Sequence, residues 1–184
     1  MSSLRSAAVL FVALAVAAGC SDPDDASVSP FPIWGQRLGM SLDSLEQFFI
    51  RQDNMPWGGC DAPGRGFKRC WRGLSFVGDL QAVADSQGRV VRIRVDVTDA
   101  TGGDLMFDND LGAMERRWFK VKGMRVDNGG VSDANPVGTV TFSTARGRWT
   151  VAVTFDGHRC YGAPRACPVR VELTDHRAGV EQVP

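Results

Sequence analysis

Three segments that alternate apolar and polar residues constrain the fold of this chain more than any other feature. From Val91 to Thr98, valine and isoleucine alternate with arginine, aspartate and threonine, and a similar alternation occurs over 149–155 and 169–174. This pattern is typical of strands that bury one face of a sheet and expose the other. Because antiparallel sheets commonly leave one face in water, the pattern predicts an antiparallel sheet with a single core face.

Helical patterns are expected before and between these strands. The first helix should begin after Ser41, which can cap it, with Asp43 beside the positive end of the helix dipole. A second should open at Asp108 or Asp110 and end before Gly123. The order helix, strands, helix, strands predicts the α+β class, with an antiparallel sheet covered by helices.

Two similar strand beginnings leave the number of structural units open. The segments "GRVVRIRVDVTD", from Gly88, and "GRWTVAVTFDG", from Gly147, start 59 positions apart, whereas the expected helix starts are about 67 to 69 apart. We expect one α+β domain over 33–178, built either of two similar halves, 33–100 and 104–178, or of independent strands. Residues 179–184 are expected to form a tail.

The chain begins with a segment that is typical of a secretory signal. Its uninterrupted apolar run, residues 7–18, has twelve residues, whereas a membrane-spanning helix needs about 20. Arg5 precedes the run and small residues follow it, which predicts a signal peptide over residues 1–19.

The residues that end this segment, Ala17, Ala18 and Gly19 before Cys20, resemble the lipobox of bacterial lipoproteins. The resemblance implies a lipoprotein signal, acylation of Cys20 with chains such as palmitate, and an anchor in the bacterial envelope facing the periplasm. Ser21, where an aspartate would favour the inner membrane, implies the outer membrane. The alternative is an ordinary signal cleavage near Ala18 that leaves a free thiol. Residues 20–32 contain three prolines and three aspartates, which predicts a lipidated, disordered tether.

Four further cysteines, Cys60, Cys70, Cys160 and Cys167, predict two disulfides in an exported chain. Three pairings are possible. We expect Cys60 with Cys70 and Cys160 with Cys167, because each pair is close in sequence. His158 lies near Cys160, but the chain has no C-x₂-C pair, so we predict neither a metal site nor another cofactor.

The sequence contains no motif that predicts catalysis. It lacks G-x-S-x-G, and its two histidines, His158 and His176, lie in polar segments. Asp108 could start a calcium loop, but Gly112 and Phe119 occupy ligand positions of that template. Two carboxylates brought together by the fold could still cleave a glycan. The leader contains one of the 21 basic residues and none of the 21 acidic ones, so the remaining chain is nearly neutral and predicts no nucleic acid partner.

The segment 55–72 is the preferred candidate for a binding surface. We expect a long loop here, because 54–70 contains four glycines and two prolines. Its aromatic and cationic residues are of the types that dominate protein interfaces, and a disulfide would reduce the cost of ordering them. Alternatively, the aromatic rings fold inward and the cations are merely solvated. The candidate binding residues are Trp57, Arg65, Phe67, Lys68, Arg69, Trp71 and Arg72.

The stretch "LGMSLDSLEQFF", residues 38–49, together with a D-x-x-G-x-V hairpin at 85–90, resembles the assembly lipoproteins of the BamE (SmpA/OmlA) kind and β-lactamase inhibitor protein. The resemblance implies a helical segment on a small antiparallel sheet, single in the first and tandem in the second. The resemblance concerns the architecture alone. From the lipobox-like leader, the lack of a catalytic motif and the candidate surface in 55–72, we predict a non-enzymatic, lipid-anchored periplasmic binding protein, either an envelope assembly factor or an inhibitor or immunity protein. Its partner would be an envelope protein or a cell-wall polymer. The alternative is an enzyme that acts on peptidoglycan or another envelope substrate.

The anchor can be tested directly. We expect mass spectrometry of the purified protein to show an acylated Cys20 at the N-terminus, and Cys20→Ser to move the protein out of the detergent-extracted membrane fraction. Acyl chains contribute ~0.8 kcal/mol per buried CH₂ to membrane binding. An unmodified mature terminus, or release of the wild type without detergent, would contradict the lipoprotein signal.

Overall fold

The structure is a computed structural model. It describes residues 22–33, 35–74, 78–97, 123–132, 134–135, 137–157 and 168–183. Within these residues there is one α-helix, α1 (Leu42–Asp53), and ten strands. The strands are β1 (Pro32–Ile33), β2 (Gln36–Arg37), β3 (Gly59–Gly64), β4 (Phe67–Leu74), β5 (Gly78–Ala84), β6 (Val90–Val97), β7 (Arg125–Asp127), β8 (Val137–Ser143), β9 (Trp149–Asp156) and β10 (Pro168–Asp175).

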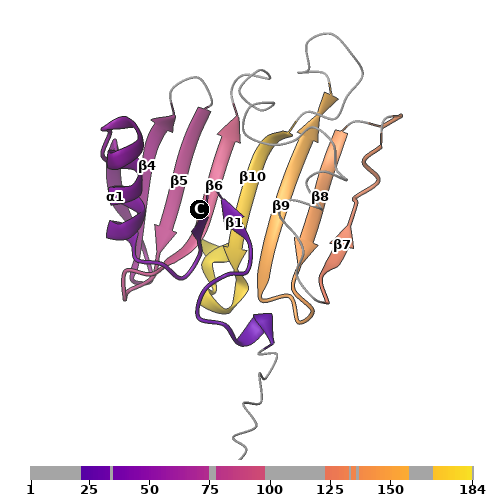
Figure 1. Ribbon diagram of the computed structural model, residues 1–184, viewed down its shortest axis with the longest axis horizontal. Helices are drawn as coiled ribbons and strands as arrows, with labels where there is room; N and C mark the ends of the chain where they lie inside the picture. The colour runs from indigo at the N-terminus through magenta and orange to yellow at the C-terminus, as the bar shows by residue number, and fades with distance from the viewer. Residues whose placement is uncertain are drawn as a thin grey trace, which may run out of the picture.

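A single antiparallel sheet of eight strands dominates the molecule (Figure 1). Its order is β3-β4-β5-β6-β10-β9-β8-β7, so that two four-stranded meanders meet where β6 pairs with β10. β1 and β2 form a separate two-stranded sheet. The expected α+β class is therefore wrong: the described chain is mostly β, and one continuous sheet replaces two α/β halves. The helix expected near Asp108 lies outside the described residues.

The alternating segments are strands, as predicted. Their register places the apolar side chains of neighbouring strands together on one face of the sheet. Val95 of β6 lies opposite Val171 of β10, and Ile93 lies opposite Leu173, which also faces Val151 of β9. These side chains are buried in the main core. The helix begins as predicted, because the Ser41 side chain accepts a hydrogen bond from the Ser44 backbone N–H at 3.1 Å. Leu42, Leu45 and Phe49 then pack into the same core.

The segment read as a long loop before Cys70 forms a hairpin, β3–β4, instead. The turn of this hairpin consists of two glycines, Gly64 and Gly66, with Arg65 between them. All three residues have positive φ, and this conformation lets β3 continue directly into β4. Cys60 and Cys70 lie opposite each other across the hairpin and form a disulfide. The second expected pair, Cys160 with Cys167, lies outside the described residues.

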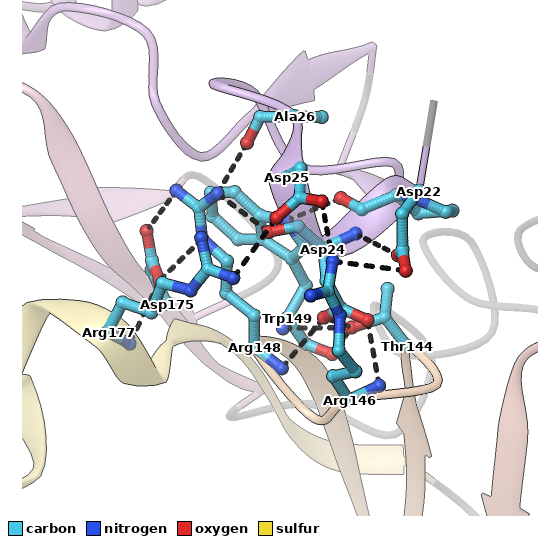
Figure 2. A network of polar contacts seen from close by, with 11 residues as sticks. Asp22, Asp24, Asp25, Ala26, Thr144, Arg146, Arg148, Trp149, Asp175 and Arg177 are labelled. Atoms are coloured by element: carbon cyan, nitrogen blue, oxygen red, sulfur yellow. Dashed lines mark hydrogen bonds and ion pairs between the residues drawn. The ribbon is translucent and has the colours of Figure 1, made fainter. Parts of the chain in front are cut away.

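The N-terminal segment differs from the expected tether, since residues 22–33 pack against the sheet. A short 3-10 helix, η1 (Pro23–Asp25), lies at the end of the sheet where β8 turns into β9 (Figures 1 and 2). Asp24 is fully buried there. Its carboxylate accepts hydrogen bonds from the Thr144 hydroxyl and from the backbone N–H groups of Arg146 (2.7 Å) and Arg148 (3.0 Å).

Three further hydrogen bonds hold the N-terminal segment against the sheet. The Arg148 guanidinium donates to the backbone carbonyls of Asp24 (3.0 Å) and Ala26 (2.6 Å), and the Trp149 indole N–H donates to that of Pro23 (3.1 Å). Phe31 and Ile33 then enter the main core. The N-terminal segment has too few apolar residues to become buried on its own. It is ordered because hydrogen-bond donors more than 100 residues further along the chain pair with its polar groups.

We expect Asp24→Ala to lower the free energy of unfolding by about 2–3 kcal/mol, because one buried donor and two partly buried donors lose their acceptor. Urea unfolding measures the change. Asp25→Ala is the matched control: Asp25 is exposed and pairs with Arg146 at the surface, so its loss should change stability far less than the loss of Asp24. Equal effects of the two substitutions would contradict the packing of residues 22–33 against the sheet through Asp24.

The same contact should depend on pH. Burial alone would raise the pKa of Asp24, but the hydrogen bonds from Thr144, Arg146 and Arg148 bring it below its ordinary value of 3.8. A lowered folded pKa gives stability that is complete above the unfolded pKa and is lost as the pH falls through the folded pKa. In Asp24→Ala, the loss of folding stability that protonation of Asp24 causes at low pH should be absent.

Candidate functional site

The side of the sheet opposite the main core carries polar and charged side chains. Except at one corner, the described side chains of this side are at least partly exposed. We call this side the polar face. It is formed by Asp61, Arg69, Trp71, Asp79, Gln81, Arg94, Asp96, Arg125, Asp127, Val137, Thr139, Thr141, Ser143, Thr150, Ala152, Thr154, Asp156, Arg170 and Glu172.

Ion pairs order the centre of the polar face. The Asp96 carboxylate on β6 accepts from Arg94 Nε at 2.7 Å and from Arg170 Nε on β10 at 2.5 Å. Thr139 and Thr154 share a hydroxyl hydrogen bond of 3.1 Å between β8 and β9. The pairs are solvent-accessible, so they contribute little to stability and leave their outer edges free to contact a partner.

Trp71 is the largest apolar group on the polar face, with 41% of its surface exposed. Its ring lies over Gly59 of β3: a Cβ at Gly59 would come within 2.7 Å of the indole Cζ2. Beside it, the Arg69 guanidinium binds the Asp61 carboxylate with two hydrogen bonds, of 3.0 and 2.5 Å. The hydrogen bond from Arg69 lowers the pKa of Asp61. The hairpin thus presents an aromatic ring next to a fixed ion pair.

The structure divides the predicted binding residues between different environments. Trp71 and Arg69 lie on the polar face, and Lys68 and Arg65 are exposed. Arg72 is 2% exposed: its guanidinium lies over the Phe49 ring, 4.8 Å from the centroid, and donates to the Met55 carbonyl at 2.6 Å.

The other two aromatic residues of the candidate set point inward. Trp57 is half-buried and packs edge-on against Phe49. Phe67 is buried in a second, smaller core. The alternative prediction, that the aromatic rings fold inward, is therefore correct for Trp57 and Phe67. Trp71 lies at the surface instead.

The expected tail at the C-terminus covers one corner of the polar side. It contains the 3-10 helix η4 (Val180–Gln182) and follows directly after another, η3 (His176–Ala178). Val180 and Val183 pack onto Phe67, Val83 and Val91 to form the second core. The buried Arg92 Nη1 donates to the carbonyls of Val180 (3.5 Å) and Val183 (3.2 Å). Burial lowers the pKa of Arg92.

One histidine meets a hydroxyl and a carboxylate at this corner. His176 Nε2 lies 2.8 Å from the Thr150 hydroxyl, and its Nδ1 contacts the Glu181 carboxylate. Sequence reasoning placed His176 in a polar loop and missed this arrangement, because the three residues come together only when η4 folds back. Both His176 and Glu181 are well exposed.

Within the described residues, no three histidine, cysteine, aspartate or glutamate side chains are placed to hold a metal ion. His158 and the acidic segment from Asp108 lie outside those residues. No described helix has the length and apolarity to cross a membrane.

Comparison with known proteins found no matching family model, no matching curated protein and no matching solved structure.

The position of Trp71 gives a test of the candidate site. Gly59→Ala should push the indole off the hairpin and shift its N–H resonance in an NMR spectrum, since the obstructing atoms belong to a movable side chain. The change in the free energy of unfolding should stay below about 1 kcal/mol. Gly73→Ala on β4 meets no atom within 4 Å and should leave the resonance in place. An unmoved resonance in Gly59→Ala would show that the ring lies elsewhere.

Proposed function

We propose that this chain is a lipid-anchored protein of the bacterial envelope, held at the outer membrane through Cys20 and facing the periplasm. It binds another envelope protein through the polar face and is not an enzyme. The observation that carries the proposal is the polar face itself: a broad ordered surface that presents Trp71 beside ion pairs and leaves the core on the opposite side.

The packed N-terminal segment supports a close attachment to the membrane. Only Ser21 lies between Cys20 and the first described residue, Asp22. Two residues of extended chain reach at most about 7 Å. An acylated Cys20 would therefore hold the end of the sheet that carries the β8–β9 turn near the lipid, and the strands would run away from it (Figure 1).

The charges of the polar face favour a protein as the partner over a cell-wall polymer. Its described arginines are outnumbered by carboxylates, and several of both are already paired. Binding to an anionic polymer needs an excess of positive charge. Mixed charges around an exposed aromatic ring are instead typical of protein interfaces. An assembly factor and an inhibitor or immunity protein would both use such a surface.

A hydrolase acting on peptidoglycan or another envelope substrate is the second candidate. What favours it is the Thr150, His176 and Glu181 arrangement, which has the order of a nucleophile, a base and an orienting carboxylate. These residues do not line the cavity found among the described residues. This candidate predicts hydrolytic activity that Thr150→Val and His176→Ala both abolish.

The binding proposal is tested by capture from envelope extracts with the full chain. Trp71→Ala should weaken binding of the captured protein at least about tenfold, as expected for a central aromatic residue. Val126→Ala is the control: Val126 is 44% exposed and lies on β7 on the other side of the sheet. Binding should then be reproduced with the purified partner. Equal weakening by both substitutions, or capture of a glycan alone, would overturn the proposal.

A further inference from the structure

A cavity of about 310 Å³ lies at the end of the sheet where the N-terminal segment packs. It is separate from the polar face. Its walls come from the N-terminal segment, the β3–β4 and β5–β6 turns, the start of β9 and the chain after β10. Four arginines line it: Arg65, Arg89, Arg148 and Arg177.

The two carboxylates of the cavity are already committed to two of these arginines. Asp85 binds Arg89 with hydrogen bonds of 3.0 and 2.8 Å, and also accepts from the Gln87 and Arg89 backbone N–H groups. Asp175 binds Arg148 with hydrogen bonds of 3.2 and 3.1 Å, and also accepts from the Arg177 backbone N–H. Neither carboxylate has the capacity to neutralise a further guanidinium.

Arg65 and Arg177 therefore contribute positive charge in excess. Within the described part of the chain, Arg65 has no hydrogen bond or ion pair, and its backbone is fixed in the left-handed turn at φ 55°. Arg177 makes one long contact, 3.4 Å, with the exposed Asp25. The cavity also has two hydroxyls, from Ser27 and Ser86, and an apolar part that includes Phe67 and Val91.

We propose that this cavity binds the phosphate group of a small phosphate ester. Guanidinium groups bind phosphate oxygens in pairs of parallel hydrogen bonds. The four arginines that line the cavity exceed its two carboxylates by two charges, which matches the double charge of a phosphate monoester. The volume is at the lower end of the range for small-molecule sites, which leaves room for a short carbon skeleton against the apolar part. The proposal does not depend on acylation of Cys20 or on a partner at the polar face.

The phosphate ester could come from solution or from a lipid headgroup. Ser27 of the cavity wall is seven positions after Cys20, so an anchored chain would have the cavity close to the membrane surface. Both sources offer the same chemistry to the arginines, and the experiment separates them.

The test is calorimetric titration of the full chain, purified in neutral detergent, with glycerol 3-phosphate. We expect saturable binding that weakens at least about tenfold in Arg65→Gln and in Arg177→Gln, the loss expected for a charge-assisted hydrogen bond. Arg51→Gln is the control, because Arg51 is an exposed arginine in the last turn of α1 and does not line the cavity, so this variant should bind as the wild type does.

Thermal unfolding of each variant checks that the fold is intact. Absence of binding by the wild type, or equal weakening in Arg51→Gln, would overturn the proposal. In a second arm, phosphatidylcholine vesicles that contain phosphatidic acid, whose headgroup is a phosphate monoester, compete with glycerol 3-phosphate, and vesicles of phosphatidylcholine alone serve as the reference. Competition only by the vesicles with phosphatidic acid supports a lipid headgroup as the source, and no competition by either supports a soluble ester.

Discussion

The pairing of β6 with β10 is the contact on which the rest of the structure depends. Each is the last strand of its own four-stranded meander, and their backbone hydrogen bonds turn two short sheets into one of eight strands. The register places Val95 opposite Val171 and, on the other side, Arg94 opposite Glu172. A slip of one residue would exchange core and surface positions along the whole strand, so the apolar side chains fix this register firmly. One wide polar face results, which two separate meanders would not provide.

The two ends of the chain complete this sheet in different ways. The N-terminal segment enters the main core with Phe31 and Ile33, and buried Asp24 fixes it to the β8–β9 turn. The C-terminal segment covers a corner of the opposite side with Val180 and Val183. Because Arg177 and Ala178 also line the arginine cavity, the C-terminal segment forms a wall shared by the cavity and the polar side.

Local patterns predicted the elements whose hydrogen bonds and burial are encoded nearby. The alternation in β6, β9 and β10 and the Ser41 cap were readable because each depends on residues within a few positions. The N-terminal segment was misread because the donors to Asp24, from Thr144 onward, lie 120 or more positions away. The β3–β4 hairpin was predicted as a loop because glycine and proline usually indicate turns. The spacing of Cys60 and Cys70 does not reveal that they lie opposite each other on two paired strands.

The candidate site shows the same limit at the level of single side chains. Trp71 and Arg72 are neighbours in sequence and were assigned to one surface, but successive strand residues point to opposite faces. Trp71 consequently lies on the polar face, whereas Arg72 is buried against Phe49. Composition drew attention to this hairpin, and only the register of β4 with β5 decides which of its side chains lie on the polar face. The arginine cavity was beyond sequence reasoning for a related reason: Arg65 and Arg177 are 112 positions apart, and only the folded chain brings the β3–β4 turn and η3 together.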